Sequence, residues 1–199
     1  MKIIVIGGTG TVGKAVVKEL SKRHTVVTAG HSSGDMQVDI TDSKTIEKMY
    51  QAAGKFDAVV STVGKVHFGE MTAMTPENYF IGLNDKLMGQ VNLVLTGLRY
   101  INAGGSFTLT SGILSSDPIR YGSSASMVNG AIDSFAIASA IEMPHGIRIN
   151  AVSPTVLAES MDAFGNYFHG FEPVLAARVA LAYSKSVEGA QTGQIYRVW

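Results

Sequence analysis

A glycine-rich segment near the start of the chain has the residue types and spacing that phosphate binding requires. The segment Gly7-Gly8-Thr9-Gly10-Thr11-Val12-Gly13 carries two overlapping spacings, Gly8-x-Gly10-x-x-Gly13 and Gly7-x-x-Gly10-x-x-Gly13. The first glycines allow a sharp turn, Gly10 leaves room for a diphosphate, and Gly13 permits close packing of a following helix. The free N–H groups and partial positive charge of that helix would attract phosphates. The segment therefore predicts a diphosphate site; the simpler interpretation is a glycine-rich turn without a ligand.

The elements on either side of this turn support the ligand interpretation. Residues 2–6, Lys-Ile-Ile-Val-Ile, form an apolar, β-branched run that is typical of a strand covered on both faces. An amphipathic stretch at 14–22 predicts a helix directly after the turn. Strand, glycine turn and helix in this order are the context in which a dinucleotide-binding motif is meaningful.

The remainder of the chain alternates between strand-like and helix-like segments. We expect further strands at 25–29, 37–40, 57–62, 106–111, 147–152 and 194–198, and helices at 43–53, 76–102 with a break near Gly82, 123–143 and 173–185. Residues 65–74 are expected to form a loop. This alternation predicts an α/β protein: one Rossmann domain over 1–199, with a doubly wound parallel sheet of about seven strands and helices on both faces. Its ligands would bind at the carboxyl ends of the strands.

Composition argues against several classes of function. The 199 residues include sixteen basic and sixteen acidic side chains, so there is no net charge to attract nucleic acid. The absence of cysteine excludes disulfides and thiolate metal sites, and the five histidines lack metal-binding spacing, so we expect no metal. We also expect no membrane association and no signal peptide, because no segment is long and apolar enough, and hence a cytoplasmic protein.

Several motifs, taken in order, resemble the short-chain dehydrogenase/reductase family over nearly the whole chain. After the glycine turn, Asp39-Ile40-Thr41 resembles the family motif that contacts adenine. Residues 57–64 stand where the family has a strand ending in Asn-Asn-Ala-Gly, although only Gly64 is kept. Residues 146–154, Gly-Ile-Arg-Ile-Asn-Ala-Val-Ser-Pro, are the most specific match, and 192–198 resemble the final strand.

The resemblance implies a nicotinamide cofactor, a small-molecule carbonyl or alcohol substrate, and a homodimer or homotetramer formed through helices 84–102 and 123–143. It also implies the residues that contact the cofactor. These are Gly7, Thr9, Gly10, Thr11, Val12 and Gly13 at the pyrophosphate, Asp39 and Ile40 at the adenine, Thr62, Val63 and Gly64 beside the adenosine, and Pro154, Thr155 and Val156 at the nicotinamide. The family usually has glycine where Thr155 stands, and Pro154 is alternatively a simple strand terminator.

The choice between NAD and NADP follows from the residues expected near the ribose 2′ position. NAD binding favours an acidic residue about 20 positions past the turn. Here that place is occupied by Gly30-His31-Ser32-Ser33, which offers hydroxyls, an imidazole and backbone N–H groups but no carboxylate. We therefore favour NADP over NAD. Asp35 is the residue that could reverse this preference, or it is an ordinary turn residue.

The proton relay of the family is only partly present. By resemblance, the relay needs a tyrosine with a lysine four residues later, a serine and an asparagine. Ser111 fits the serine, or is a capping hydroxyl. If Tyr121 is the tyrosine, Ala125 occupies the lysine position. A second register, which we favour, places Asn129 at the lysine position and Ala125 at the tyrosine position, and neither register contains a Tyr-x-x-x-Lys pair.

The asparagine has two candidates. Asn84 is one, whereas aligning Gly89 with a family glycine places Lys86 near that position. Lys86 could supply the positive charge that the other helix has lost, and Tyr121 could still be the acid if its loop folds over the crevice. In the alternative interpretation, Lys86 is a solvated surface residue and Tyr121 a partly buried aromatic.

Two function classes remain open from the sequence. The first is an NADP-dependent oxidoreductase with an altered proton relay, in which Ser111 polarises the carbonyl. The second is a non-catalytic NADP-binding redox sensor, and a non-redox enzyme on the same fold is a weaker third. Aromatic residues in the two loops expected over the crevice suggest a partly apolar substrate or loop anchors: Phe68, Phe164, Tyr167, Phe168 and Phe171.

Overall fold

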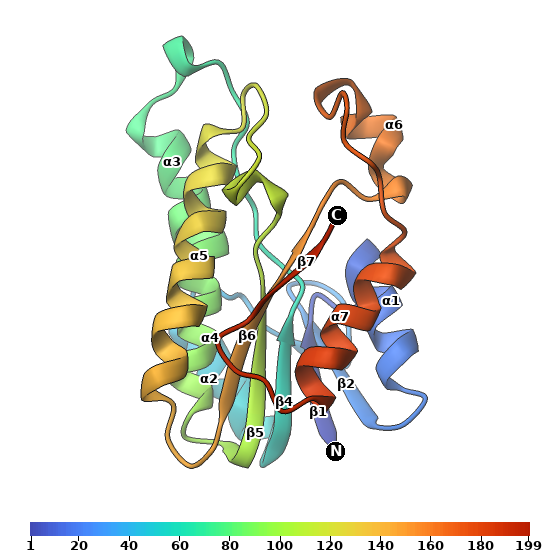
Figure 1. The fold of residues 1–199 in the computed structure, drawn as a ribbon. Helices are drawn as coiled ribbons and strands as arrows, with labels where there is room; N and C mark the ends of the chain where they lie inside the picture. The colour runs from blue at the N-terminus through green and yellow to red at the C-terminus, as the bar shows by residue number, and fades with distance from the viewer.

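The structure, a computed structural model that describes residues 1–199, is built on a sheet of seven parallel strands (Figure 1). The strand order is β3-β2-β1-β4-β5-β6-β7, so the chain reverses its direction of winding between β1 and β4. This confirms the predicted doubly wound sheet. The strands are β1 Lys2–Ile6, β2 Thr25–Gly30, β3 Met36–Gln37, β4 Phe56–Ser61, β5 Ile101–Thr110, β6 Arg148–Pro154 and β7 Ile195–Val198.

Each face of the sheet has its own hydrophobic core because side chains alternate along a strand. Ile3 and Val5 of β1 belong to the cluster covered by α1 and α7, whereas Ile4 and Ile6 belong to the cluster under α2, α4 and α5. Figure 1 shows α1 and α7 on one side of the sheet and α2, α4 and α5 on the other. The bounds of these helices are α1 Thr11–Leu20, α2 Ser43–Ala53, α4 Gly89–Gly97, α5 Ser123–Glu142 and α7 Ala176–Glu188.

The segment predicted as one helix over 76–102 is divided. It consists of α3 Pro76–Gly82, the π-helical turn η2 Leu83–Met88 and α4; at the expected position near Gly82 the hydrogen-bond pattern changes, but the backbone stays helical. The prediction of helix up to residue 102 was wrong, and the helical part of the proposed 84–102 interface segment ends at Gly97. Ile101 is buried and pairs with Phe56 of β4, so these tertiary contacts draw the following residues into the sheet.

The loops at the carboxyl ends of the strands contain short helical turns that the sequence patterns did not reveal. These are η1 Met71–Ala73, η3 Ile113–Ser115, η4 Ala158–Ser160, α6 Met161–Phe164 and η5 Gly165–Tyr167. The predicted strand 37–40 is only the two-residue β3, although Val38 and Ile40 are buried directly after it. None of the helices has the length and apolar character needed to cross a membrane.

Candidate active site

The glycine turn between β1 and α1 has a shape that side chains would fill. Gly7 has φ +79°, in the left-handed region, and a Cβ at residue 13 would lie 1.9 Å from the Gly7 carbonyl oxygen. Gly10 precedes α1 in extended conformation, and no side chain caps the helix. The first N–H groups of α1 are therefore open to a ligand. The turn fits the diphosphate of a dinucleotide, as its spacing predicts.

A cavity of about 430 Å³ opens beside this turn, at the carboxyl ends of β1, β2 and β4. It is lined by Ile6, Gly30, His31, Val38, Asp39, Ile40, Thr41, Val63, Gly64, Lys65 and Asp85. Asp39 accepts hydrogen bonds from the Thr41 hydroxyl and the Thr41 N–H, which lower the pKa of its carboxyl. The predicted adenine contacts Asp39 and Ile40 thus share one cavity with Gly64, large enough for an adenine ring.

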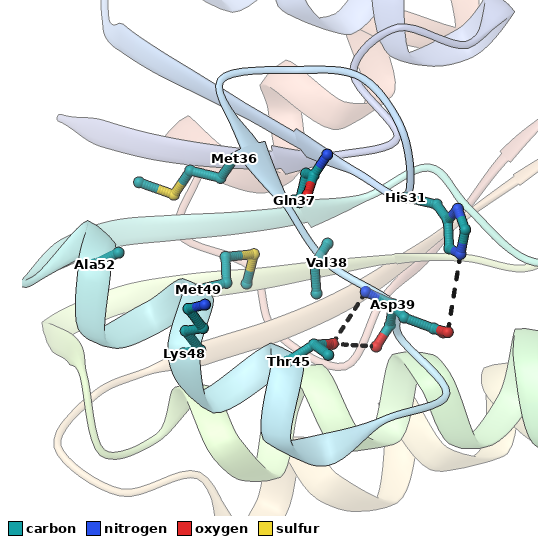
Figure 2. Close-up of a pocket in the computed structure, with 9 residues that line it drawn as sticks. All are labelled: His31, Met36, Gln37, Val38, Asp39, Thr45, Lys48, Met49 and Ala52. Atoms are coloured by element: carbon teal, nitrogen blue, oxygen red, sulfur yellow. Dashed lines mark hydrogen bonds and ion pairs between the residues drawn. The ribbon is translucent and has the colours of Figure 1, made fainter.

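Figure 2 shows a neighbouring pocket of about 410 Å³ on the outer side of the segment that carries Asp39. His31 Nε2 lies 4.0 Å from Asp39 Oδ2, and the Thr45 hydroxyl accepts from the Asp39 N–H at 3.0 Å (Figure 2). His31, Val38 and Asp39 line both this pocket and the adenine cavity. The segment therefore separates the two hollows, and α2 fixes its position through Thr45.

The end of β2 presents no carboxylate toward the glycine turn. His31, Ser32 and Ser33 are exposed, and the Ser33 hydroxyl lies 2.8 Å from that of Thr9 in the turn. Asp35 instead folds back on β2, where it accepts from the N–H and the hydroxyl of Thr28, both at 2.8 Å. These bonds lower the pKa of Asp35. Asp35 is therefore a turn residue in this structure. It does not take the other role considered for it, an acidic contact with the cofactor ribose.

The segments after β4 and β6 lie at the same edge of the sheet. The Thr62 hydroxyl donates to the Ile6 carbonyl at 2.9 Å, and Val63 packs so closely that a Cβ on Gly7 would lie 2.4 Å from it. Pro154 ends β6, and the next two residues, Thr155 and Val156, are buried. The hydroxyl of Thr155 has no hydrogen-bond partner in the protein.

Lys86 and Ser111 meet at the carboxyl end of β5. The Lys86 ammonium, carried by η2, donates to the backbone carbonyl of Ser111 at 3.1 Å. Burial lowers the pKa of Lys86 to about 8, and the nearby charge of Asp133 on α5 partly opposes this effect. The stem of Lys86 lies against Gly64, where a Cβ would come within 2.4 Å of its Cγ. Lys86 is thus a partly buried cation beside the predicted cofactor site.

Gln90 holds this arrangement together and was not identified from the sequence. Its side chain is fully buried; Nε2 donates to the carbonyls of Thr110 and Lys86 at 2.9 and 3.1 Å, and Oε1 accepts from the Thr110 N–H at 2.8 Å. Gln90 therefore ties the helix that carries Lys86 to the strand that leads into Ser111. Its spacing of four residues from Lys86 was the available signal, because such residues share one helix face.

Buried polar atoms without protein partners collect around the same strand end. They include the Ser111 hydroxyl, the side-chain oxygen of Asn129 and one carboxylate oxygen of Asp133. Asn129 lies close to Gly112, where a Cβ would be 3.0 Å from its amide nitrogen. Since buried polar groups normally find a partner, these atoms mark a place for hydrogen bonds to substrate or water.

The family model described as Enoyl-(Acyl carrier protein) reductase matches residues 6–192, nearly the whole chain. The chain belongs to the short-chain dehydrogenase/reductase family. The family uses NAD(P)(H), in agreement with the glycine turn and the neighbouring cavity described above.

Three relatives of this short-chain dehydrogenase/reductase illustrate the relationship. The protein lin1944 from Listeria innocua is 54% identical over 100% of both chains, with a TM-score of 0.98. A small-chain dehydrogenase whose structure is in complex with NADPH is 27% identical, covers 100% of this chain and 96% of its own, and has a TM-score of 0.87. Versicolorin reductase 1 from Dothistroma septosporum is 26% identical over 81% of this chain and 72% of its own.

Two predicted relay residues of this short-chain dehydrogenase/reductase lie apart from the group around Lys86. Asn84 is exposed on η2. Tyr121 lines an outer pocket, and its hydroxyl donates to Glu70 Oε1 at 3.4 Å. The structure therefore brings together Lys86, Ser111 and the buried amide of Asn129, and gives Tyr121 different neighbours.

Proposed function

We propose that this protein is an NADP-dependent oxidoreductase that interconverts a carbonyl and an alcohol, with Lys86 as the proton donor of its altered relay. The observation that carries the proposal is the contact of the Lys86 ammonium with Ser111, in a site where burial brings the pKa of Lys86 to about 8. A general acid works best when its pKa lies near the working pH. Named reductases among the relatives, such as versicolorin reductase, support the reaction class.

In the proposed reaction, Ser111, Lys86 and Asn129 each have a separate role. The bound cofactor supplies or accepts the hydride. The Ser111 hydroxyl, which has no partner in the protein, donates a hydrogen bond to the substrate carbonyl oxygen. The Lys86 ammonium gives its proton to that oxygen as negative charge develops there. Asn129 offers a buried amide beside Gly112 and steadies the water or substrate polar group that the site admits.

The preference for NADP rests on the end of β2. Oδ2 of Asp35 accepts from the N–H and the hydroxyl of Thr28 on β2, so this oxygen is engaged within the protein and not by a ribose 2′-hydroxyl. His31 and the hydroxyls of Ser32 and Ser33 are exposed at this position and can contact a phosphate. The similar dehydrogenase in complex with NADPH supports the same choice.

Assembly through α4 and α5 is also part of the proposal. Both helices expose large apolar side chains: Met88 and Leu95 on and before α4, and Met127, Ile137 and Ile141 on α5. If these side chains form one surface, they would mark an interaction site, since large exposed apolar patches usually do. We propose that these helices pair with their copies in a homodimer or homotetramer.

The experiment that tests the relay compares three variants: Lys86→Met, Lys86→Arg and, as a control, Lys55→Met. Lys55 is an exposed lysine just before the amino end of β4, far from the carboxyl ends of the strands. A panel of carbonyl compounds, followed by NADPH absorbance, first identifies a substrate. We expect Lys86→Met to lower kcat by about 10²–10⁴-fold, the usual contribution of general acid catalysis, with unchanged NADPH affinity. Lys55→Met should keep wild-type activity.

The pH dependence provides a second readout. Reduction needs protonated Lys86, so kcat for reduction should fall as pH rises through about 8, and kcat for alcohol oxidation should rise over the same range. Lys86→Arg should remove this transition because arginine stays protonated. Wild-type kcat and an unchanged pH profile in Lys86→Met would exclude the proposed relay. Tight NADPH binding without turnover of any carbonyl would indicate a binding protein instead.

A further inference from the structure

The outer pocket that contains Tyr121 is a second well-formed hollow, distinct in composition from the cofactor cavity. It measures about 460 Å³ and is formed by three loops, 68–70, 119–121 and 163–168. Seven of its nine lining residues are hydrophobic, and five of the nine carry aromatic rings. A pocket of this size, predominantly apolar and with few polar groups, has the usual character of a small-molecule site.

Three aromatic residues of this pocket, Phe68, Phe164 and Tyr167, are exposed, whereas Tyr121 and Phe168 are partly buried. Phe164 and Tyr167 are 44% and 48% exposed. The Tyr121 ring meets Tyr167 edge-on with centroids 6.1 Å apart, and the Tyr121 carbonyl accepts from the Gly69 N–H at 3.0 Å. Tyr121 has φ +65°, which is unfavourable for a bulky residue. Such strain persists where the surroundings impose it, and it concentrates at ligand sites.

The pocket lies next to the segment that follows β5 and contains Ser111. Two of its residues, Ile119 and Phe168, pack against the small cluster of Ile113 and Leu114. Ile113 is separated from Ser111 only by Gly112. In the proposed reaction, a ring held in the pocket would direct its carbonyl toward Ser111.

The charge of the pocket restricts which molecules it accepts. Glu70 is its one charged lining residue, and no lysine, arginine or histidine lines it. A carboxylate, phosphate or sulfate on the substrate would face Glu70 with no compensating cation, whereas a hydroxyl group could donate to the Glu70 carboxylate or bond to the Tyr121 hydroxyl.

We propose that the outer pocket selects neutral aromatic carbonyl compounds, with a hydrogen-bond donor on the ring, and rejects anionic ones. This inference rests on the proposed function, since it names the substrate class of the same reaction. The aromatic walls supply stacking and edge contacts with the ring, and Glu70 supplies both the acceptor for the donor group and the repulsion of anions.

Two aldehydes of similar shape test the inference. We expect kcat/KM with NADPH for 4-(hydroxymethyl)benzaldehyde to exceed that for 4-carboxybenzaldehyde by about tenfold or more, equivalent to about 1.4 kcal/mol. In Glu70→Gln, the ratio of the two kcat/KM values should fall to about threefold or less, equivalent to about 0.65 kcal/mol. This change should arise mainly from KM. Phe164→Leu should raise KM for both aromatic aldehydes and leave that of propanal unchanged. Phe80→Leu, an exposed phenylalanine of α3 outside the pocket, is the control.

Equilibrium binding separates this inference from the proposed reaction. Calorimetry with wild type and NADPH compares benzene-1,4-dimethanol with 4-carboxybenzyl alcohol, neither of which can be reduced by this complex. Tighter binding of the neutral alcohol, lost in Glu70→Gln, supports the pocket even if no aldehyde turns over. Equal binding of both alcohols, or equal kcat/KM for both aldehydes in wild type and Glu70→Gln, would overturn it.

Discussion

Adding one methyl group to the glycine turn tests whether this turn binds the diphosphate. A Cβ on Gly10 would meet a single protein atom within 4 Å, the Gly7 carbonyl oxygen at 3.3 Å, and would otherwise occupy open space. The backbone of Gly10, at φ −76° and ψ 177°, suits alanine. A methyl group there occupies space that the folded protein leaves empty and that the ligand is predicted to fill.

The expected energies follow from this geometry. Alanine at position 10 reduces the conformational freedom of the unfolded chain, which stabilises the fold by about 0.4–1 kcal/mol. Alanine is also a poorer N-cap than glycine, which destabilises the fold by a similar amount. The two effects nearly cancel, so the Tm should change by only a few degrees. With NADPH at about 100 times its Kd, wild type gains about 2.7 kcal/mol. A tenfold loss of affinity in Gly10→Ala would leave about 1.4 kcal/mol at the same concentration.

Gly13→Ala is the contrasting variant, because its Cβ would overlap the Gly7 carbonyl oxygen at 1.9 Å. Both partners in that overlap are backbone, so the turn itself must shift. We expect a loss of about 2 kcal/mol from overpacking, or roughly 4–8 °C in Tm for a chain of this size.

Thermal unfolding with and without NADPH, together with fluorescence titration of NADPH, measures both effects. The expected pattern is that Gly10→Ala keeps its Tm without ligand but loses about half of the ligand-induced shift, whereas Gly13→Ala starts from a lower Tm. Wild-type NADPH affinity in Gly10→Ala would refute the assignment of the turn to the diphosphate. A wild-type Tm in Gly13→Ala would refute the packing argument.

Three further predictions concern other parts of the molecule. Gln90→Leu leaves buried groups of Thr110 unpaired, so the free energy of unfolding, measured in urea, should fall by about 2–3 kcal/mol. The pH midpoint of kcat should also shift, and an unchanged midpoint would argue against a positioning role for Gln90. Glu188, whose pKa is lowered to about 2 chiefly by its hydrogen bond with Arg23, stabilises the fold above its unfolded pKa of about 4.3. The stability difference between wild type and Glu188→Gln should therefore shrink as pH falls from 5 to 2, and a constant difference would contradict this. Ile141→Glu, at a side chain 87% exposed on α5, should halve the mass measured by light scattering, whereas Leu181→Glu on α7 should not.

The features that the sequence predicts well are those fixed by neighbouring residues. The strand, glycine turn and first helix follow from the apolar run at 2–6 and the glycine spacing, and the structure reproduces them within a few residues. Asp42, a residue type typical of helix N-caps, precedes α2 and accepts from the Lys44 N–H at 2.8 Å. Such local signals need no knowledge of the rest of the fold.

The features that the sequence does not predict depend on contacts between distant residues. Ile101 continues an apolar pattern that looks helical, but its pairing with Phe56 across the sheet places it in β5. The π-helical turn that presents Lys86 is likewise held by Gln90 of α4, whose partner Thr110 lies on β5. Whether Asp35 contacts the cofactor or forms part of the turn depends on the loop conformation, which places its carboxylate against Thr28.

In the proposed relay, an exchange of residue types between two helices would compensate for the absence of a Tyr-x-x-x-Lys pair. In the favoured register, Asn129 occupies the family's lysine position, and Lys86 lies near the family's asparagine position. Both side chains reach the same end of β5, Lys86 at the Ser111 carbonyl and Asn129 beside Gly112. An ammonium and an amide are thus both present near Ser111, but the ammonium now comes from η2 and the amide from α5.

This exchange has a consequence for the proton donor. A lysine on α5 would assist a tyrosine four residues earlier on the same helix face, but that position is Ala125. The ammonium of Lys86 approaches from the opposite helix, is bonded to Ser111 and lies in the field of Asp133. In the proposed relay no phenol stands between Lys86 and Ser111, and the Lys86 ammonium takes the role of proton donor to the substrate oxygen. The pH at which reduction fails should therefore follow the pKa of Lys86, near 8, instead of that of a tyrosine.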